Sequence, residues 1–524
     1  MGFADPFPDY SVLLRTIVYG LVPAFGVWQF VRLRRALHPF QLEGYKRRRY
    51  LAWCRANRGR VIVGPDLSAK KPLAMTGRAW RILVLATALS ILAILGATGG
   101  VHLVAGWPLD VATWLLVTAA AFCVTPELIA AADWLLSPVQ AAINSRYEEG
   151  ARRKLGGVGP EVIGVTGSFG KTSTKFAVAG LVGPSEAVLA TPASYNTPMG
   201  VVRAINENLA PEHRWFVVEM GAYGRGDIAQ LCDLVHPRVG VLTAIGPAHL
   251  ERFGSLEAIR DTKYELIASL PADGLAVMNS DDAEVRALAA ATRHVEVALY
   301  GTEPRWSPDV SATDVRVTPR GTEFTVIDRC TGREVELSTK LLGAHAIGHI
   351  LAGIAVATHF GRSLDALAEA VARLTPVEHR LQLLEGTADV TVIDDAFNSN
   401  PQGAEIALEV LGAMPARRRV IVSPGIIELG DLQFEANRRF GHSAAAVADA
   451  LIVVGDLNRE AILEGARDAA PGSSGAAEVV AVSTLAEARR RLADLLRPGD
   501  AVLFENDLPD HLEVTTRRAQ SGRP

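Results

Sequence analysis

One glycine-rich segment carries the residue types that bind phosphate. The apolar stretch EVIGVTG leads into Gly167-Ser-Phe-Gly-Lys-Thr-Ser-Thr174, and a helical pattern, KFAVAGLV, follows. The backbone N–H groups of such a loop and the N-terminus of the next helix can surround phosphate oxygens. A lysine in this place reaches the β- and γ-phosphates, and the hydroxyl that follows it is a magnesium ligand. Residue 165 is Val where the strict pattern has Gly. The predicted ATP-binding residues are Gly167, Ser168, Gly170, Lys171, Thr172 and Ser173.

Two side chains at predicted strand ends could complete a metal site beside that loop. Glu219 ends the apolar stretch WFVVEMG, and His249 follows another strand in VLTAIGPAHLERFGS. In enzymes with a phosphate-binding loop, a carboxylate at the end of a neighbouring strand can hold magnesium. The alternatives are an ordinary acid at a strand end and a structural histidine.

The elements that would position these residues follow an α/β pattern. From about residue 140, short apolar runs such as RVGVLTAIG, VTVIDD and AVLFEND alternate with alanine-rich amphipathic stretches. Buried strands separated by helices are typical of a mostly parallel sheet. The stretch 296–340 is richer in alternating residues and predicts small antiparallel strands. We therefore expect an α/β fold.

Composition narrows the class of protein. The chain has 524 residues, of which 49% are hydrophobic and 21% charged, and its formal net charge is −4. The length allows roughly two to four domains, and the composition excludes a disordered chain. The charge balance gives no indication of nucleic-acid binding. The four cysteines are widely spaced, which excludes a zinc ribbon and a disulfide scaffold and suits a reducing cytoplasm.

Three apolar runs precede the phosphate-binding segment, at 12–31, 82–107 and 111–126. The first two are long enough to span a bilayer, and the second contains no Asp, Glu, Lys or Arg. A buried core helix is the alternative for each run, above all for the shorter third one. Three runs in succession, with a mean hydropathy of +0.19, favour about three transmembrane helices.

Charge predicts how these helices are oriented. Residues 32–81 contain fourteen Lys and Arg but only two acids, whereas the first ten residues contain no Lys or Arg. By the positive-inside rule, 32–81 is a cytoplasmic loop, the N-terminus is external, and the second and third runs form a hairpin near residues 106–110. The first residues are acidic, so a cleaved signal peptide fits poorly. The basic loop could also bind anionic membrane lipid.

Ten motifs, taken in order along the chain, resemble those of the Mur ligases. They are GVTGSFGKTSTK, TPASYNTPMGV, VVEMG, GPAHLERFGS, DTKYELI, VMNSDD, LLGAHAIGH, EHR, VIDDAFNSNP and IIELG. The resemblance covers roughly residues 145–515 and is greatest to the member that adds D-alanyl-D-alanine to a muramoyl tripeptide. It implies a central ATPase domain with a phosphate loop and a Rossmann-like C-terminal domain. It also implies amide-bond formation through an acyl phosphate, with ATP and two magnesium ions.

The resemblance implies roles for individual residues of the central domain. The expected catalytic residues are Lys171, His249 and Lys263. The expected magnesium ligands are Thr172, Glu219, His249 and Lys263, the last as a carbamate. A plain helical lysine is the alternative for Lys263.

The remaining expected residues contact the nucleotide or the carboxyl substrate. Asn279 would contact adenine, and Arg380 and Asp395 would hold the ribose and phosphates. The loop with Asn196 and Thr197 would face the carboxyl substrate. A second loop would shape the nucleotide and substrate cleft through Asn398, Asn400 and Pro401.

Three departures from the family pattern stand out. The motif G-x-H-N-x-x-N reads GAHAIGH at Gly343–His349, which puts one adenine-side contact in doubt and gives a weak HxxxH zinc signal. FENDLPD, at 504–510, stands where the family usually has a Lys-Gly-Ser loop near the incoming amine. The apolar runs and the basic loop occupy the place of the uridine-binding N-terminal domain.

These observations predict a ligase anchored in the cytoplasmic membrane, with its catalytic domains in the cytoplasm. The expected domains are a membrane region at 1–137, a central ATP-binding domain at 138–375 and a C-terminal domain at 376–524. The expected substrates are a cell-envelope precursor with a free carboxylate and an amino-acid or dipeptide amine. Polyglutamate-type ligation of another carboxylate, and a membrane-tethered nucleotide-binding regulator without ligase activity, remain as alternatives.

Overall fold

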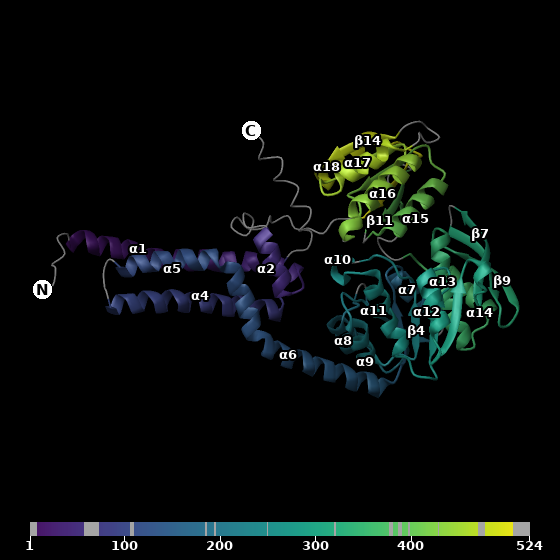
Figure 1. Ribbon diagram of the computed structural model, residues 1–524, viewed down its shortest axis with the longest axis horizontal. Helices are drawn as coiled ribbons and strands as arrows, with labels where there is room; N and C mark the ends of the chain where they lie inside the picture. Colours follow the sequence, from purple (N-terminus) through teal and green to yellow (C-terminus); the bar gives the residue numbers. More distant parts are fainter. Residues whose placement is uncertain are drawn as a thin grey trace. The chain divides into compact units, whose positions relative to one another are not determined.

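The computed structural model describes residues 8–56, 73–104, 109–183, 186–192, 195–248, 250–318, 321–376, 381–385, 390–396, 399–427, 429–469 and 477–506. The chain divides into two compact units, Met1–Ser145 and Arg146–Pro524. The described part of the first unit is helical, and the second unit contains two sheets with their helices (Figure 1). The boundary predicted at residue 137 falls inside a helix that continues to Val158.

Helices build the first unit (Figure 1). They are α1 (Pro8–Leu42), α2 (Arg47–Ala56), α4 (Gly77–Val104), α5 (Leu109–Cys123) and the first part of α6 (Thr125–Val158). Among them, α1, α4 and α5 lie side by side. Their buried core includes Phe40 of α1, Tyr50 of α2 and Leu83 of α4. The buried Arg32 side chain donates a hydrogen bond to Thr125 Oγ1 at 3.0 Å, which ties α1 to the start of α6.

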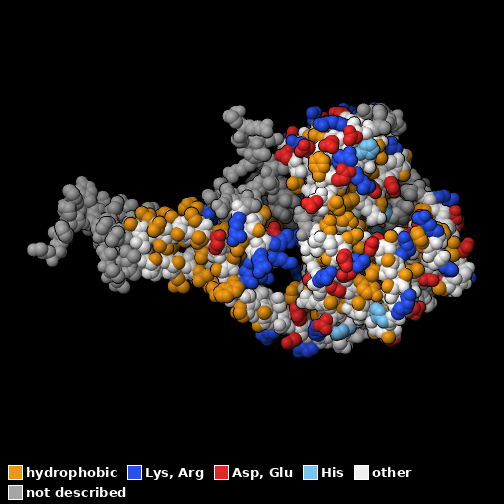
Figure 2. Space-filling model, in the orientation of Figure 1, with side chains coloured by type: hydrophobic (Ala, Val, Ile, Leu, Met, Phe, Trp, Pro, Cys, Tyr) orange, Lys and Arg blue, Asp and Glu red, His pale blue; other side chains and the backbone are white. Residues whose placement is uncertain are grey.

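Within the described residues, Gly77–Ala97 of α4 is the one helix segment long and apolar enough to cross a bilayer by itself. Ala112–Cys123 and Thr125–Val158 meet that criterion only together, and they are bent by 74° at their junction. Length and composition alone are weak evidence for a transmembrane helix, since a core helix of a globular protein can have the same length and composition. The predicted run 12–31 lies within α1, but its side chains up to residue 23 are outside the described ones. Apolar side chains cover much of the surface of these helices (Figure 2).

A nine-stranded sheet forms the first part of the second unit, in the order β2-β3-β1-β4-β5-β6-β7-β8-β9. Its strands are β1 (Glu161–Thr166), β2 (Ala187–Ala190), β3 (His213–Glu219), β4 (Val239–Leu242), β5 (Leu275–Asn279), β6 (Glu296–Gly301), β7 (Val310–Thr318), β8 (Gly321–Asp328) and β9 (Arg333–Thr339). Neighbours from β2 to β7 are parallel, and β7, β8 and β9 are antiparallel. The expectation of antiparallel strands across 296–340 is therefore wrong for β6. A helical crossover joins β5 to β6, and such a connection returns the chain in the same direction.

Helices cover both faces of this sheet. The apolar core on one face includes α7 (Lys171–Val182), α13 (Ala344–His359) and α14 (Leu364–Ala372). The core on the other face includes the end of α6 with α8 (Pro198–Asn208), α9 (Asp227–Val235), α11 (Leu256–Ala268) and α12 (Ala283–Ala291). The short helices α10 (Leu250–Phe253) and η1 (Pro304–Trp306) lie in connections. Because β1, β3, β4 and β5 are parallel, their carboxyl ends lie at one edge of the sheet.

A six-stranded sheet, in the order β10-β11-β15-β12-β13-β14, forms the last part of the chain. Its strands are β10 (Gln382–Glu385), β11 (Thr391–Asp395), β12 (Arg419–Ser423), β13 (Ala450–Val454), β14 (Glu478–Val482) and β15 (Ala501–Glu505). Its helices are α15 (Pro401–Ala413), η2 (Gly430–Leu432), α16 (Gln433–Val447), α17 (Arg459–Arg467) and α18 (Leu485–Leu495). All neighbouring strands are parallel except β10 and β11. The predicted α/β class is confirmed.

Candidate active site

The glycine-rich segment forms a tight loop between β1 and α7. Gly167 and Gly170 have φ angles of 152° and 74°, values that side chains rarely allow. A Cβ atom on Gly167 would lie 2.0 Å from Thr243 Oγ1, and one on Gly170 would lie 2.6 Å from His349 Cε1. Both positions therefore require glycine. The strand, loop and helix stand in the order that a phosphate-binding loop needs.

The polar residues predicted for this loop gather at the N-terminus of α7. Lys171 Nζ donates hydrogen bonds to the carbonyl oxygens of Gly167, at 2.8 Å, and Ser168, at 3.1 Å. Thr172 is buried, and Ser173 lines an adjoining cavity. A phosphate in the loop would meet the first N–H groups of the helix and the ammonium group of Lys171.

A buried ion pair lies beside the loop. Lys175, one turn after Lys171, is fully buried, and its Nζ lies 3.3 Å from Glu219 Oε2 and donates to the Thr191 carbonyl at 2.7 Å. Glu219 Oε1 accepts a hydrogen bond from Asn196 Nδ2 at 3.1 Å. The helix of the phosphate loop and a predicted substrate residue therefore meet at one carboxylate. Lys175 is absent from the predicted residues, because a helical lysine carries no signal except its i, i+4 spacing from Lys171.

Lys263 of α11 is also buried in this region. Burial lowers its pKa to about 7, and the charge of Lys171 acts in the same direction. The negative charges of Asp227, Glu265 and Glu219 oppose this lowering only in part. A lysine with such a pKa is partly a neutral amine at pH 7, and a neutral amine is nucleophilic.

A cavity of about 260 Å³ adjoins the phosphate loop. Predicted residues that line it are Gly170, Ser173, Asn279, Asp395 and Asn400, which come from both sheets' domains. Asn279 ends β5, and its Nδ2 donates a hydrogen bond to the Thr243 carbonyl at 2.8 Å. The structure thus brings the predicted adenine contact next to the loop that would hold the phosphates.

Two histidines of α13 also line this cavity. His349 Nδ1 lies 2.9 Å from Thr174 Oγ1. Burial lowers the pKa of His345 to about 4, so its ring is neutral at pH 7, and its Nδ1 has no hydrogen-bond partner among the described residues. The two ring centroids are 6.1 Å apart. Within the part of the chain that is described, no group of three or more His, Cys, Asp and Glu could hold a metal ion, so the zinc alternative gains no support.

The remaining predicted residues lie at the ends of strands and helices. Asp395 ends β11, and its Oδ1 accepts a hydrogen bond from the Leu381 N–H at 3.1 Å. Asn400 caps α15 by accepting from the Gly403 N–H at 2.9 Å, so its side chain also has a structural role. Thr197 precedes α8 as its N-cap residue. Predicted residues that fall outside the described part of the chain are His249, Arg380 and Asn398.

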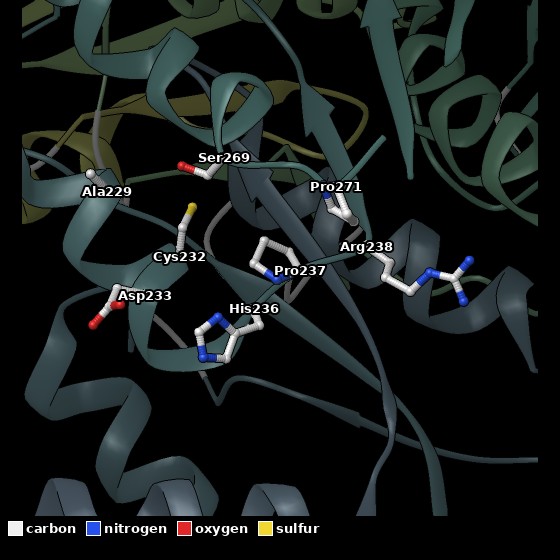
Figure 3. Close-up of a pocket in the computed structure, with 8 residues that line it drawn as sticks. All are labelled: Ala229, Cys232, Asp233, His236, Pro237, Arg238, Ser269 and Pro271. Atoms are coloured by element: carbon white, nitrogen blue, oxygen red, sulfur yellow. The ribbon is translucent and has the colours of Figure 1, made fainter. Parts of the chain in front are cut away.

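A second cavity, of about 530 Å³, adjoins α9 and the start of β4 (Figure 3). Cys232, His236 and Arg238 are among its lining residues, and none of the predicted site residues is. Burial raises the pKa of the Cys232 thiol to about 11, which keeps the thiol protonated and unreactive. Arg238 is paired with Asp273 at 3.1 Å. Because β4 begins directly after Arg238, this cavity lies at the edge of the sheet opposite the phosphate loop.

Comparison with known proteins identifies both domains of the second unit. The family model for the Mur ligase middle domain matches residues 165–357, and the model for the Mur ligase glutamate ligase domain matches residues 379–505. The UDP-N-acetylmuramoyl-tripeptide--D-alanyl-D-alanine ligase of Mycobacterium bovis is 34% identical over 369 residues, which cover 66% of this chain and 70% of that protein. The Escherichia coli protein of the same name is 33% identical over 295 residues, covering 56% of this chain and 64% of that protein.

Solved structures give the same result. MurF from Acinetobacter baumannii matches with a TM-score of 0.62 at 25% identity, covering 72% of this chain and 81% of that one. MurF ligase from Thermotoga maritima, solved in complex with ADP, matches with a TM-score of 0.62 at 26% identity, covering 71% of this chain and 82% of that one. These matches agree with the phosphate loop and the two sheets described above. The chain belongs to the Mur ligase family of ATP-dependent, ADP-forming ligases.

Proposed function

We propose that this protein is a membrane-anchored Mur-type ligase that joins the carboxylate of a peptidoglycan precursor to an amino acid or dipeptide. The observation that carries the proposal is the contact of Lys175 and Asn196 with Glu219 beside the phosphate loop. It sets a triphosphate-binding loop next to a residue expected to face the carboxyl substrate. Relatives named UDP-N-acetylmuramoyl-tripeptide--D-alanyl-D-alanine ligase support a dipeptide as the amine substrate.

The reaction proceeds in two displacements. A carboxylate oxygen of the precursor bonds to the γ-phosphorus of ATP as the bond to ADP breaks, which gives an acyl phosphate. The amine nitrogen then bonds to the acyl carbon, phosphate leaves, and the nitrogen loses a proton. Both partners of the first step are anions, so the cationic Lys171 at the loop lowers the barrier by stabilising the charge on the γ-phosphate.

The donor atoms present suit magnesium. The Thr172 hydroxyl and the Glu219 carboxylate are hard oxygen ligands, and both lie in buried positions close to the loop. Together with Lys263 and His249 they would hold two magnesium ions. Bound magnesium would neutralise phosphate charge and so favour the approach of the carboxylate.

Lys263 fits this site as a carbamate. Its neutral amine would bond to the carbon of CO2 and release a proton, which replaces a buried cation with an anion that can bind a cation. The low pKa of Lys263 supports this modification, because the neutral amine is the form that reacts. The change would also remove the repulsion between Lys263 and Lys171.

The first unit would anchor the protein in the cytoplasmic membrane, with the catalytic domains in the cytoplasm and the N-terminus outside. Large apolar side chains on its helices are open to the surroundings, among them Leu92 and Leu95 of α4 and Leu116 of α5, which are 66%, 62% and 71% exposed. Figure 2 shows apolar side chains along these helices. A bilayer would cover this apolar surface, whose exposure to water is unfavourable.

Seven arginines lie at the end of α1, on α2 and at the start of α4, and we term them the basic end of the first unit. They are Arg34, Arg35, Arg47, Arg48, Arg49, Arg78 and Arg81. Arg78 lies 2.8 Å and Arg47 3.9 Å from the carboxylate of Asp133. Arg47 Nη1 and Arg78 Nε are buried without a hydrogen-bond partner among the described residues. Glu43, 3.2 Å from Arg49, is a second acid there, and two acids do not balance seven arginines. The basic end therefore suits the phosphate of an anionic lipid or of a lipid-linked precursor.

The test is to supply the full-length protein, in detergent or vesicles, with ATP, pooled envelope precursors and D-alanyl-D-alanine, and to identify products by mass. A ligase makes ADP, phosphate and one amide product in equal amounts. ADP release without an amide product, or nucleotide binding without turnover, would support the regulator alternative instead. A product with another amine or carboxylate would correct the substrate assignment.

A further inference from the structure

A pair of carboxyl groups lies at the carboxyl edge of the C-terminal sheet. The parallel strands β11 and β15 are neighbours, and Asp395 and Glu505 are directly paired in their register. In open parallel sheets, ligands bind outside the carboxyl ends of the strands. Asp395 lines the cavity next to the phosphate loop, whereas Glu505 is fully buried behind it.

The contacts of Glu505 leave one of its oxygens unused. The hydroxyl of Ser399 donates a hydrogen bond to Glu505 Oε1. Glu505 Oε2 is buried and has no hydrogen-bond partner among the described residues. Asn506 connects Asp395 to Ser399. Its backbone N–H donates a hydrogen bond to the Asp395 carbonyl at 3.2 Å, and its Oδ1 accepts one from the Ser399 N–H at 3.2 Å. Glu505 therefore belongs to a buried polar network that reaches the cavity wall.

The surroundings of Glu505 oppose its ionisation. Burial raises its pKa well above the usual value for a glutamate, and the neighbouring charge of Asp395 raises it further. The Ser399 hydroxyl is the one described group that acts the other way. The groups that face the Glu505 carboxyl are thus Asp395 from β11 and Ser399 from the loop before α15, and no described cation is paired with it. An unpaired carboxylate in such a place is costly, and the neutral acid avoids that cost.

We propose that Glu505 is a positioning residue: it remains a neutral carboxylic acid and, through the proton it keeps beside Asp395, holds that carboxylate in place for the nucleotide. The inference rests on the proposed function of the cavity as the nucleotide site. Asp395 is fixed on its other side by the Leu381 N–H. With Glu505 neutral, the pair carries one negative charge instead of two beside an incoming triphosphate.

The inference also accounts for an unusual feature of the sequence. Glu505 belongs to the acidic segment FENDLPD, which stands where the family usually has a basic loop. An acidic residue so close to the cavity would repel phosphate if it were ionised. A neutral Glu505 keeps the hydrogen-bonding capacity of an acid without that charge.

The first test is the affinity of the full-length protein for ADP with magnesium, measured by calorimetry. Glu505→Gln keeps a neutral side chain of the same shape, and we expect its affinity to stay within about twofold of wild type. Glu505→Ala leaves Asp395 without its neighbour, and we expect roughly tenfold weaker binding or more. An alanine variant that binds like wild type, or a glutamine variant that binds as weakly as the alanine variant, would overturn the proposal.

The second test is the infrared spectrum of the same proteins at pH 7.5. The difference between wild type and Glu505→Gln should contain the C=O band of one protonated carboxylic acid, which shifts in D2O and again when ADP binds. A difference spectrum with the bands of an ionised carboxylate would contradict the proposal. A wild-type protein that binds no ADP would instead overturn the proposed function. The C=O band of the nucleotide-free protein would still report whether Glu505 is protonated.

Asp500→Asn is the matched control. Asp500 is equally buried and precedes the other end of β15, where it lies 3.6 Å from Arg418. This variant should lower the unfolding temperature but leave ADP affinity within about twofold. A loss of affinity as large as that of Glu505→Ala would show that the effect reports general damage to the sheet, and would contradict a positioning role.

Discussion

At the scale of residues, the site brings three lysines of α7 and α11 close to the phosphate loop. Lys175 is paired with Glu219, while Lys171 raises the cost of a charge on Lys263 and contributes to its low pKa. The cationic groups beside the loop suit a triphosphate and an anionic carboxyl substrate. The loop motif predicts Lys171 and Thr172, but Lys175 becomes visible only when the fold brings β3 beside α7.

Replacing Lys171 with alanine should abolish ligation and leave the fold intact. In the proposed reaction its ammonium group would stabilise charge on the γ-phosphate. Such interactions are commonly worth about 3 kcal/mol or more, so turnover should fall at least a hundredfold. Phosphate release with all substrates present measures the effect, and thermal unfolding checks the fold. Lys340→Ala, at an exposed position after β9, is the control. Near-normal turnover in Lys171→Ala would refute the phosphate-loop assignment.

Lys263→Ala should be nearly inactive if this lysine works as a carbamate. Short carboxylates such as acetate or formate, at millimolar concentration, should then restore part of the rate, because they supply the missing anion in the cavity left by the side chain. Rates with and without the added carboxylate give the answer. Full activity in the variant would mean that Lys263 has no part in the reaction.

The low pKa of Lys263 predicts how stability depends on pH. In the folded protein the pKa is about 7, against an ordinary value of 10.5, so between these values the unfolded chain binds more protons. Stability must then rise with pH across this window, by the contribution of this group. Lys263→Met lacks that contribution. In CO2-free buffer, the unfolding temperature of wild type minus that of Lys263→Met should therefore increase from pH 7 to pH 9. A difference that stays constant over this range would contradict the low pKa.

At the scale of elements, the sequence is informative wherever a local pattern decides the structure. EVIGVTG followed by GSFGKTST predicts the strand, loop and helix that the structure contains. The direction of β6 and the adjacency of Asp395 and Glu505 depend on strand order, which no local pattern carries. The boundary predicted at residue 137 falls within α6, which continues through Pro138 to Val158.

Gly167→Ala should disrupt the loop. The added Cβ would lie 2.0 Å from Thr243 Oγ1 and 3.0 Å from the Ala244 nitrogen, and the backbone has a φ angle of 152°. Crowding and strain of this kind cost about 1–3 kcal/mol each, and we expect a lower unfolding temperature and weak ADP binding. Gly157→Ala is the control, since that helical position has open space and alanine favours a helix. ADP binding by Gly167→Ala at wild-type strength would contradict the geometry of the loop.

At the scale of the whole molecule, a helical unit precedes the two Mur ligase domains. The matching family models begin at residue 165, and the described nucleotide-site residues all follow it. The end of α6 belongs structurally to the second unit, because Ala151 and Leu155 are buried in the core of its first sheet. A cut at residue 137 would keep the part of α6 up to Ser145 that belongs to the first unit, whereas a cut before Arg146 follows the boundary between the two compact units.

A shortened protein that begins at Arg146 should be soluble without detergent and bind ADP within about twofold of the full-length protein. It should have a raised KM for a lipid-linked precursor, since it lacks the basic end and the apolar helices. Full-length protein with Arg47 and Arg78 both changed to glutamine separates the basic end from the helices. Equal KM values for the lipid-linked precursor in all three proteins would show that the first unit does not contribute to substrate binding.

Membrane-bound ligation is tested by an assay of the full-length protein in vesicles of anionic lipid. It should compare a uridine-linked and a lipid-linked tripeptide precursor, each with ATP, magnesium and D-alanyl-D-alanine, and identify the product by mass. We expect one amide product per ADP released, no product with Lys171→Ala, and the higher kcat/KM on the lipid-linked precursor. ADP release without any amide product, on either precursor, would contradict this expectation.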